Sequence, residues 1–220
     1  MLCQNGPMPA STSFASESLS ERVKRIIVDR VIEGAYPPGT HLVELQLAEE
    51  FGVSQAPVRE ALRELSSTRL VENRPRRGTY VRSISPEELA EIYMVRVALE
   101  GTAAFHAFPT LHQDPSPLRE ALTRMREAVD AGSARGLAKY STQFHRAIIE
   151  ASGNRLMVEI WDSLFVEVRT MATIVRGQVD PRAAAESHAP IVEAFETGDA
   201  QLCQQLVAEH QQEYSILPHE

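Results

Sequence analysis

Three histidines lie where helices would bury them: His145, His188 and His210 each have isoleucine, leucine or valine three and four positions away. At helical spacing, each falls on the apolar face of its own helix and points into a bundle. One histidine in such a place is most often a hydrogen-bonded core residue. Neutral imidazoles from three helices can instead form a site for one divalent metal ion, zinc or nickel, with positions left open for water or a ligand.

An arginine in an apolar segment is the next candidate. Arg96 is one of few charges in residues 93–99, YMVRVAL. It either pairs with Glu100 or extends along apolar surface to solvent, or it clamps the carboxylate of a small organic acid through two parallel hydrogen bonds. Arg169 is a weaker candidate for the same clamp, and Tyr93 is expected to line the pocket.

A further group of candidates lies in residues 45–66, LQLAEEFGVSQAPVREALRELS. The apolar positions predict two short crossed helices joined by a turn at Gly52, with the Ser54 side chain capping the second helix. Small and polar side chains are left for the surface that would meet DNA: Gln46, Ser54, Gln55, Ala56, Arg59 and Arg63. Such a face can meet base edges and phosphates in the major groove of DNA. Any small helical hairpin would also expose arginines. The flanking residues must therefore distinguish a DNA-binding motif from an ordinary hairpin.

The flanking residues have the order of a winged helix. Residues 18–34 predict an amphipathic helix, and a Pro-Pro-Gly-Thr turn separates it from residues 45–66. Two β-prone runs, around 69–73 and 79–83, flank a turn that contains Arg76, Arg77 and Gly78. A hairpin tip of this kind can lie against phosphates and reach the minor groove. The N-terminal part is therefore expected to bind double-stranded DNA.

The rest of the chain has helical periodicity and no strand signal. Ser85 and Pro86 begin the first helix, and six helical segments are expected near 86–108, 116–131, 133–152, 155–177, 181–197 and 199–216. Breaks are expected at residues 109–110, 132, 153–154, 180–181 and 198–199. Six helices with short connections predict an antiparallel bundle.

The expected fold is mainly α, with an N-terminal winged helix-turn-helix and a C-terminal antiparallel six-helix bundle. Residues 17–83 form the expected DNA-binding domain. Residues 84–220 form the expected all-helical domain for effector binding and dimerisation. Residues 1–16 are small and polar, and we expect a disordered arm there.

Composition is compatible with this division. A chain of 220 residues with 43% hydrophobic content can form two modest domains. Two cysteines, no apolar run of membrane-spanning length and no signal peptide predict a cytoplasmic protein without disulfides or membrane partners. The net charge of −8 divides into +1 for residues 1–82 and −9 for residues 83–220. The arginine-bearing first part can therefore meet nucleic acid, and the acidic second part is not expected to touch DNA.

The run VIEGAYPPGTHLVELQLAEEFGVSQAPVREALRELSSTRLVENRPRRGTYV resembles the DNA-binding domain of GntR-family bacterial transcription regulators. The Pro-Pro-Gly-Thr turn, the Gly-Val-Ser…Pro-Val-Arg-Glu-Ala-Leu run and the Arg-Gly-Thr-Tyr-Val wing match the family pattern, over most of residues 18–83. Many relatives have Arg-Thr where this chain has Gln55-Ala56. Because glutamine prefers adenine edges and arginine prefers guanine, the usual operator preference is not assumed here.

The helical part resembles the ligand-sensing FCD domain of the FadR branch, in the VanR-like subgroup. The similar segments are 91–100, 144–154 and 186–199. The resemblance implies a divalent ion held by the three histidines and an effector carboxylate clamped by Arg96. Relatives usually have Asp or Asn four residues before the first histidine, where this chain has Ser141. Because a hydroxyl is a poorer ligand than a carboxylate, metal binding should be weakened here, or completed by water and effector.

These features predict a DNA-binding transcription regulator, a repressor rather than an enzyme. A homodimer would bind a palindromic operator, and a small organic-acid effector would change its affinity. A metal-dependent hydrolase at the three histidines is the alternative from another class, although no free carboxylate is evident as its base. A structural scaffold is the other alternative.

Overall fold

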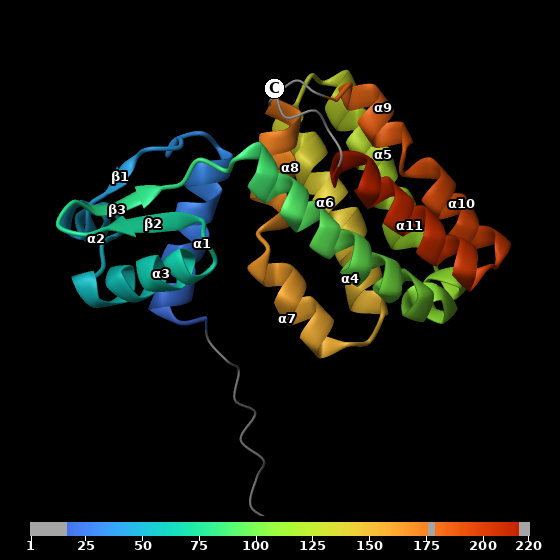
Figure 1. Ribbon diagram of the computed structural model, residues 1–220, viewed down its shortest axis with the longest axis horizontal. Coiled ribbons are helices and arrows are strands. Elements are labelled where there is room, and N and C mark those ends of the chain that lie inside the picture. Colours follow the sequence, from blue (N-terminus) through green and yellow to red (C-terminus); the bar gives the residue numbers. More distant parts are fainter. Residues whose placement is uncertain (1–16, 176–178, 216–220) are drawn as a thin grey trace, which may run out of the picture.

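The computed structural model describes residues 17–175 and 179–215, which form two lobes joined through residues 82–85 (Figure 1). The expected arm at 1–16 lies outside the described residues. One lobe holds a small sheet and three helices, and the other is entirely helical. The expected mainly α fold is confirmed.

The N-terminal lobe is a winged helix-turn-helix. Its elements are α1 Leu19–Ile32, β1 His41–Leu42, α2 Glu44–Phe51, α3 Gln55–Ser67, β2 Val71–Arg74 and β3 Gly78–Val81. The strands pair antiparallel in the order β1-β3-β2. Ser18 and Glu21 form a capping box that begins α1. An apolar core of α1, α2, α3 and the strands holds the lobe together, and it includes Ile27, Val58 and Leu65.

In the turn between α2 and α3, Gly52 has the backbone conformation expected of it, whereas Ser54 does not make the expected capping hydrogen bond. Gly52 ends α2 in the left-handed conformation, with φ of 66°. Ser54 occupies the N-cap position of α3, but its side chain makes no capping hydrogen bond, so the prediction of a capping hydroxyl is wrong. The physical reason is Pro57, the third residue of α3. Proline has no amide hydrogen to donate, and it removes one of the two usual partners of a capping oxygen.

The C-terminal lobe contains all six expected helical segments, but two of them are divided. Its helices are α4 Pro86–Gln113, α5 Ser116–Asp130, α6 Ala134–Ala151, α7 Arg155–Ser163, α8 Val166–Val175, α9 Pro181–Glu186, α10 Ala189–Thr197 and α11 Ala200–Ser215. The described part of this lobe therefore has eight helices rather than six. The first helix is also longer than expected, because α4 continues through the predicted break at Pro109. Pro109 lies on the solvent-exposed side of α4, and proline removes only one backbone hydrogen bond of the helix there.

Each unexpected break has a local cause. Phe165 lies in the left-handed region with φ of 46°, which a continuous helix cannot contain, and it separates α7 from α8. Pro190 stands at the start of α10. Its ring would clash with the preceding helical turn, so α9 ends at Glu186 and His188 becomes the N-cap of α10.

Close packing of α4 and α11 forms the centre of the helical lobe, where the two helices lie side by side (Figure 1). Gly101 permits this approach, because a Cβ at this position would come within 3.2 Å of the Ala208 Cβ. Apolar side chains from α4, α5, α6, α10 and α11 fill the surrounding core. No helix of the described residues is both long enough and apolar enough to cross a membrane.

The two lobes share apolar contacts through α8. Val168 is buried within the core cluster of the winged lobe, and Phe165 packs against the same cluster. The left-handed turn at Phe165 therefore places side chains of the helical lobe in the core of its neighbour.

Candidate functional site

The second helix of the helix-turn-helix presents the side chains that the sequence predicts. Gln55, Ala56, Arg59 and Arg63 are all exposed on α3, whereas Val58, Ala61, Leu62 and Leu65 are buried on its other side. Gln46 is exposed on α2. This polar surface of α3 carries two cations one turn apart, as suits a helix that enters the major groove.

Arg59 has a partner that sequence reasoning missed. Its guanidinium lies 3.0 Å from a carboxylate oxygen of Glu44, at the start of α2. The Arg59 side chain is 65% exposed, so this ion pair contributes little to stability and is easily exchanged for a phosphate or a base edge. Glu44 thus holds Arg59 at the outer surface of the helix-turn-helix.

The wing between β2 and β3 places Arg76, Arg77 and Gly78 at an exposed tip. Arg76 and Gly78 both have positive φ, 62° and 96°. Gly78 is also needed for space, because a Cβ there would overlap the imidazole of His41. His41 in turn stacks on Tyr80, with ring centroids 4.5 Å apart. The sheet therefore holds the arginine tip in a fixed shape.

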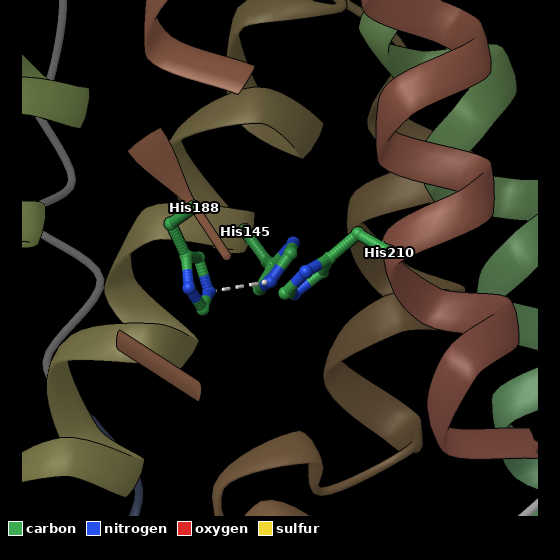
Figure 2. Close-up of side chains that lie close together, drawn as sticks. All are labelled: His145, His188 and His210. Atoms are coloured by element: carbon green, nitrogen blue, oxygen red, sulfur yellow. Dashed lines mark hydrogen bonds between the residues drawn. The ribbon is translucent and has the colours of Figure 1, made fainter. Parts of the chain in front are cut away.

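In the helical lobe, the three predicted histidines converge (Figure 2). His145 on α6, His188 at the start of α10 and His210 on α11 are all buried, and their ligand nitrogens lie within 4.8 Å of one another. The Nε2 atoms of His145 and His188 are 3.2 Å apart. The cluster of these three residues is called the histidine cluster below.

Hydrogen bonds fix which nitrogen of each ring faces the centre of the histidine cluster. His188 Nδ1 lies 2.9 Å from the carbonyl oxygen of Ala184, and His145 Nδ1 lies 2.9 Å from a carboxylate oxygen of Glu100. Both oxygens accept only, so each Nδ1 carries the proton and each Nε2 keeps its lone pair. Gln211 Nε2 lies 3.2 Å from His145 Nε2, and Ser141 Oγ lies 3.4 Å from His188 Nε2. A cation between the two lone pairs would relieve the repulsion that remains between them. A carboxylate behind a metal-ligating histidine is a common supporting arrangement.

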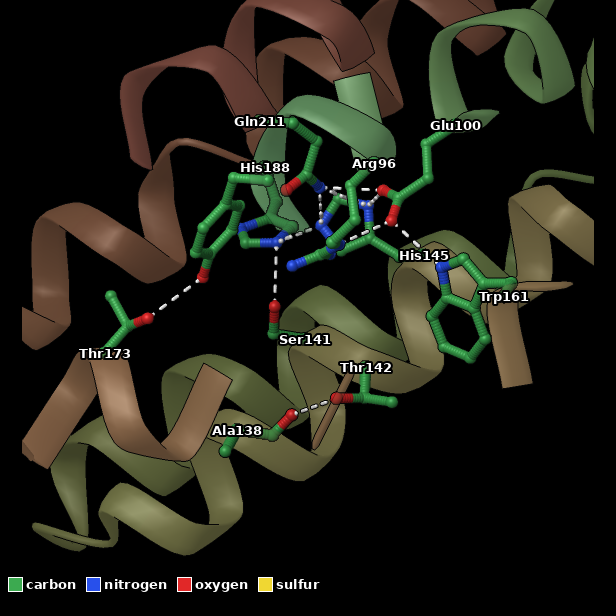
Figure 3. Close-up of polar contacts among 11 residues, drawn as sticks. Arg96, Glu100, Ala138, Ser141, Thr142, His145, Trp161, Thr173, His188 and Gln211 are labelled. Atoms are coloured by element: carbon green, nitrogen blue, oxygen red, sulfur yellow. Dashed lines mark hydrogen bonds and ion pairs between the residues drawn. The ribbon is translucent and has the colours of Figure 1, made fainter. Parts of the chain in front are cut away.

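Glu100 is the main residue of the site that the sequence did not predict as functional (Figure 3). Its carboxylate accepts from Arg96 Nε at 2.7 Å, Trp161 Nε1 at 2.9 Å and Gln211 Nε2 at 2.7 Å, besides its contact with His145. Burial alone would raise the pKa of the Glu100 carboxyl, but the charge of Arg96 with the contacts of His145 lowers it to about 2. Glu100 is therefore ionised and fully engaged.

The imidazoles are held neutral. Burial lowers the pKa of all three histidines: that of His188 falls to about 3, with a further contribution from His145, and that of His210 lies well below its usual value. Neutral imidazole is the form that binds metal. His210 Nδ1 is buried without a hydrogen-bond partner.

A small cavity of about 30 Å³ adjoins the histidine cluster. Its lining includes the predicted Tyr93, Arg96 and Ser141, together with Thr170, Thr173 and Tyr214, which the sequence did not single out. Ser141 Oγ lies 3.4 Å from His188 Nε2. A space of this size holds one or two water molecules, so a larger ligand must displace side chains.

Arg169 does not lie with these residues. It is absent from the lining of the cavity, and the charged groups that act on its pKa are Glu88 and Arg82, near the junction of the lobes. The structure does not bring Arg169 to the cavity that Arg96 lines, and a clamp role for Arg169 stays a prediction.

The residues of the histidine cluster fit a divalent metal ion. Two nitrogens 3.2 Å apart match the roughly 3.4 Å that separates two ligands of a tetrahedral ion bound at about 2.1 Å. The orphaned Nδ1 of His210 and the opposed lone pairs of the other two rings would all be compensated by a cation. Ser141 supplies a hydroxyl near His188 where a carboxylate would bind more tightly.

A winged helix-turn-helix with an arginine-bearing open face, joined to a helical lobe, defines a DNA-binding transcription regulator. Residues 19–81 match the family described as bacterial regulatory proteins, gntR family, and residues 91–213 match the FCD domain. The chain belongs to the GntR family, in the group whose members carry an FCD domain. The resemblance inferred from the motifs is confirmed.

Named relatives are regulators of the same kind. The chain is 35% identical to a probable D-xylose utilization operon transcriptional repressor of Paenarthrobacter nicotinovorans, over 91% of this chain and 88% of the relative. It is 28% identical to the regulator McbR of Escherichia coli over 96% and 97%. The solved structure of McbR aligns with a TM-score of 0.76 over 89% of this chain and 94% of that chain. A putative GntR regulator from Rhodococcus sp. RHA1 aligns with a TM-score of 0.75, over 89% and 95%, at 25% identity.

Proposed function

We propose that this protein is a cytoplasmic, non-catalytic transcription repressor that binds a palindromic operator as a homodimer. A small carboxylate effector, together with a zinc or nickel ion at the histidine cluster, controls its affinity for DNA. The observation that carries this proposal is the presence, in one chain, of an open arginine face on α3 and a buried cluster of three neutral histidines beside Arg96.

The DNA part rests on charge and exposure. Arg59 and Arg63 are the cations of the α3 face, and Arg76 and Arg77 are those of the wing tip. Arginine at base edges supplies specificity, whereas wing arginines at phosphates supply affinity that falls with salt. Gln55 and Ala56 at the start of α3 make adenine edges and thymine methyl groups the expected contacts there.

The effector part rests on Arg96. Its Nε is used by Glu100, and the residue lines the cavity, so its terminal amino groups are available to a carboxylate. The ionised Glu100 repels such a carboxylate, and a metal ion at the histidine cluster would offset this repulsion. The effector is therefore expected to require the metal.

The dimer part rests on the outer face of α4. From Ile92 to Gln113 the only Asp, Glu, Lys or Arg residues are Arg96 and Glu100, and both are buried. Met94, Val95 and Phe105 are exposed on this face, 66%, 45% and 38% respectively. An uncharged stripe roughly 33 Å long suits self-association with a second copy, and a palindromic operator requires one.

The test of DNA binding uses the upstream region of the protein's own gene. Wild type should bind it with sequence selectivity, and Arg59→Ala should lose roughly 1–3 kcal/mol of specific binding free energy. Arg182→Ala, on the surface of α9, is the matched control and should bind as wild type does. Equal affinity of Arg59→Ala and wild type at the same salt concentration would refute the role of α3.

Metal and dimer are tested separately. Protein purified without a nickel column should contain close to one zinc or nickel per chain, and His188→Ala should contain less than a tenth of this. The effector should change operator affinity only in metal-loaded protein.

Sedimentation should give a dimer for wild type and a monomer for Val95→Arg, whereas Leu156→Arg on exposed α7 should stay dimeric.

A further inference from the structure

One face of the wing sheet carries a stack of three planar side chains. Strand pairing places His41 of β1 and Glu72 of β2 opposite Tyr80 of β3. The imidazole of His41 lies on the Tyr80 ring, with centroids 4.5 Å apart and 12° between the two planes. The guanidinium carbon of Arg74, on β2, lies 4.4 Å from the centroid of the same ring. Because β3 lies between β1 and β2, the Tyr80 ring is held between groups that come from its two neighbouring strands.

Both outer members of the stack are themselves restrained. Arg74 Nε donates to a carboxylate oxygen of Glu72 at 2.8 Å. His41 lies directly over Gly78, where any Cβ would overlap the imidazole. A cation or a second ring on an exposed aromatic face is a weak contact by itself. Together these contacts restrict the directions in which the Tyr80 side chain can point.

The Tyr80 hydroxyl reaches the tip of the wing. It donates to the backbone carbonyl oxygen of Arg77 at 3.0 Å, and the amide of Arg77 donates to the carbonyl oxygen of Arg74 at 2.9 Å. The preceding residue, Arg76, has a left-handed backbone with φ of 62°, a conformation that persists in a residue other than glycine when its surroundings enforce it. The hydroxyl of Tyr80 is therefore a restraint on a strained turn.

We propose that Tyr80 is a positioning residue for DNA binding, whose hydroxyl fixes the Arg77 peptide and thereby the direction in which the wing-tip arginines meet the phosphates. The proposal rests on the proposed DNA binding of the wing. Tyr80 acts through Arg77, because its hydroxyl hydrogen is used within the wing and its ring is engaged by His41 and Arg74. The side chains of Arg76 and Arg77 are exposed and are the groups that contact DNA.

The test measures binding of the full-length protein to two labelled duplexes, one of random sequence and one from the upstream region of its own gene, over a range of salt concentrations. Tyr80→Phe keeps the ring and removes the hydroxyl. Its affinity for both duplexes should fall roughly two- to tenfold, the net effect of one hydrogen bond. The dependence of its affinity on salt should also become shallower, because a cation no longer meets its phosphate well.

A double-mutant cycle separates positioning from a direct contact. In an Arg77→Ala background, Tyr80→Phe should lower the affinity little further, because the group that the hydroxyl positions has gone. Tyr36→Phe is the matched control: it removes a hydroxyl that donates to Glu50 in the same lobe, and it should bind as wild type does. Full additivity of Tyr80→Phe and Arg77→Ala would overturn the proposal. Wild-type affinity and salt dependence in Tyr80→Phe, or an equal loss in Tyr36→Phe, would also overturn it.

A second cycle tests the stack. His41→Ala should weaken DNA binding in the wild-type background and have little further effect in Tyr80→Phe, because the stack acts through the hydroxyl. An equal loss in both backgrounds would mean that the exposed imidazole contacts DNA itself, and would overturn the role given to the stack. A wild type that binds neither duplex would overturn the proposed function and this proposal together. Normal binding by wild type with no effect of Tyr80→Phe would overturn this proposal alone.

Discussion

Glu100 determines the electrostatics of the helical interior. It is completely buried and ionised, and it is surrounded by donors from α4, α6, α7 and α11. Its charge balances that of Arg96, the candidate effector-binding residue, and its carboxylate orients His145 of the histidine cluster. Glu100 therefore acts on the effector site and on the metal site without belonging to either.

Glu100→Gln should destabilise the fold strongly. The substitution leaves Arg96 as a buried charge without its partner, a change that typically costs about 3–5 kcal/mol. Urea unfolding measures the difference in the free energy of unfolding. Glu150→Gln, which breaks an exposed pair with Arg146, is the control and should change this free energy by less than about 1 kcal/mol. Similar values for the two variants would contradict the central role of Glu100.

The neutral histidines predict acid sensitivity of the metal-free protein. The pKa of His145, His188 and His210 is lower in the folded state than in the unfolded chain, so unfolding takes up protons below about pH 6.5. Stability is then highest above pH 6.5 and falls as the pH decreases toward 3, the value for His188. Thermal unfolding in chelator at pH 7.5, 6 and 5 should reveal this trend.

Two variants test the assignment to buried histidines. His188→Leu should have a shallower loss of Tm with falling pH, whereas His106→Gln, at an exposed histidine, should follow wild type. A wild type whose Tm is unchanged between pH 7.5 and 5 would contradict the neutral state of the histidine cluster.

The sequence predicts the histidines well and their partners poorly, for a physical reason. Each histidine has apolar neighbours at helical spacing, and this local signal places it inside a bundle. Trp161 and Gln211 are 61 and 111 positions from Glu100, and no local pattern relates residues at that distance. Ser141 and Arg96 were predicted because each departs from the apolar pattern around it or from the family motif.

At the scale of elements, the periodicity of apolar residues predicts where helical segments lie, but it does not predict where a segment is interrupted. The segment 155–177 keeps helical spacing across Phe165, and only the contact of this residue with the winged lobe explains its left-handed turn. Pro190 carries a local signal that divides α9 from α10, whereas the similar signal at Pro109 breaks nothing. Proline interrupts a helix where the packing around it also favours a helix end at that point.

The wing should be sensitive to a single methyl group at Gly78. In Gly78→Ala the alanine would have to adopt an unfavourable positive φ, and its Cβ would displace His41. The tip with Arg76 and Arg77 should therefore lose its shape. Operator affinity should fall at least tenfold, measured by fluorescence anisotropy. Gly153→Ala is the matched control: its φ of 70° is similarly strained, roughly 1–2 kcal/mol, but nothing lies within 4 Å. Equal affinities for the two variants would contradict the steric argument.

At the scale of the whole molecule, the two lobes are expected to unfold together. Val168 of the helical lobe is buried in the core of the winged lobe, so neither core is complete alone. Calorimetry should give one transition for wild type and two for Val168→Asp, which places a charge in the shared core. Val175→Asp, on the same helix but 66% exposed, should keep a single transition. Two transitions in wild type would contradict the shared core.

Residues of α8 line both the cavity beside the histidine cluster and a larger space of about 360 Å³ between the lobes. Ligands bound in the two would be linked thermodynamically if either of them shifts α8. A helix is only about 10 Å across, so any occupant that shifts α8 changes the shape available on its other side. Linkage then requires reciprocity: a ligand that alters the dissociation constant of another by some factor has its own constant altered by the same factor. An affinity measured for either side of α8 would therefore be defined only at a stated concentration of the occupant opposite.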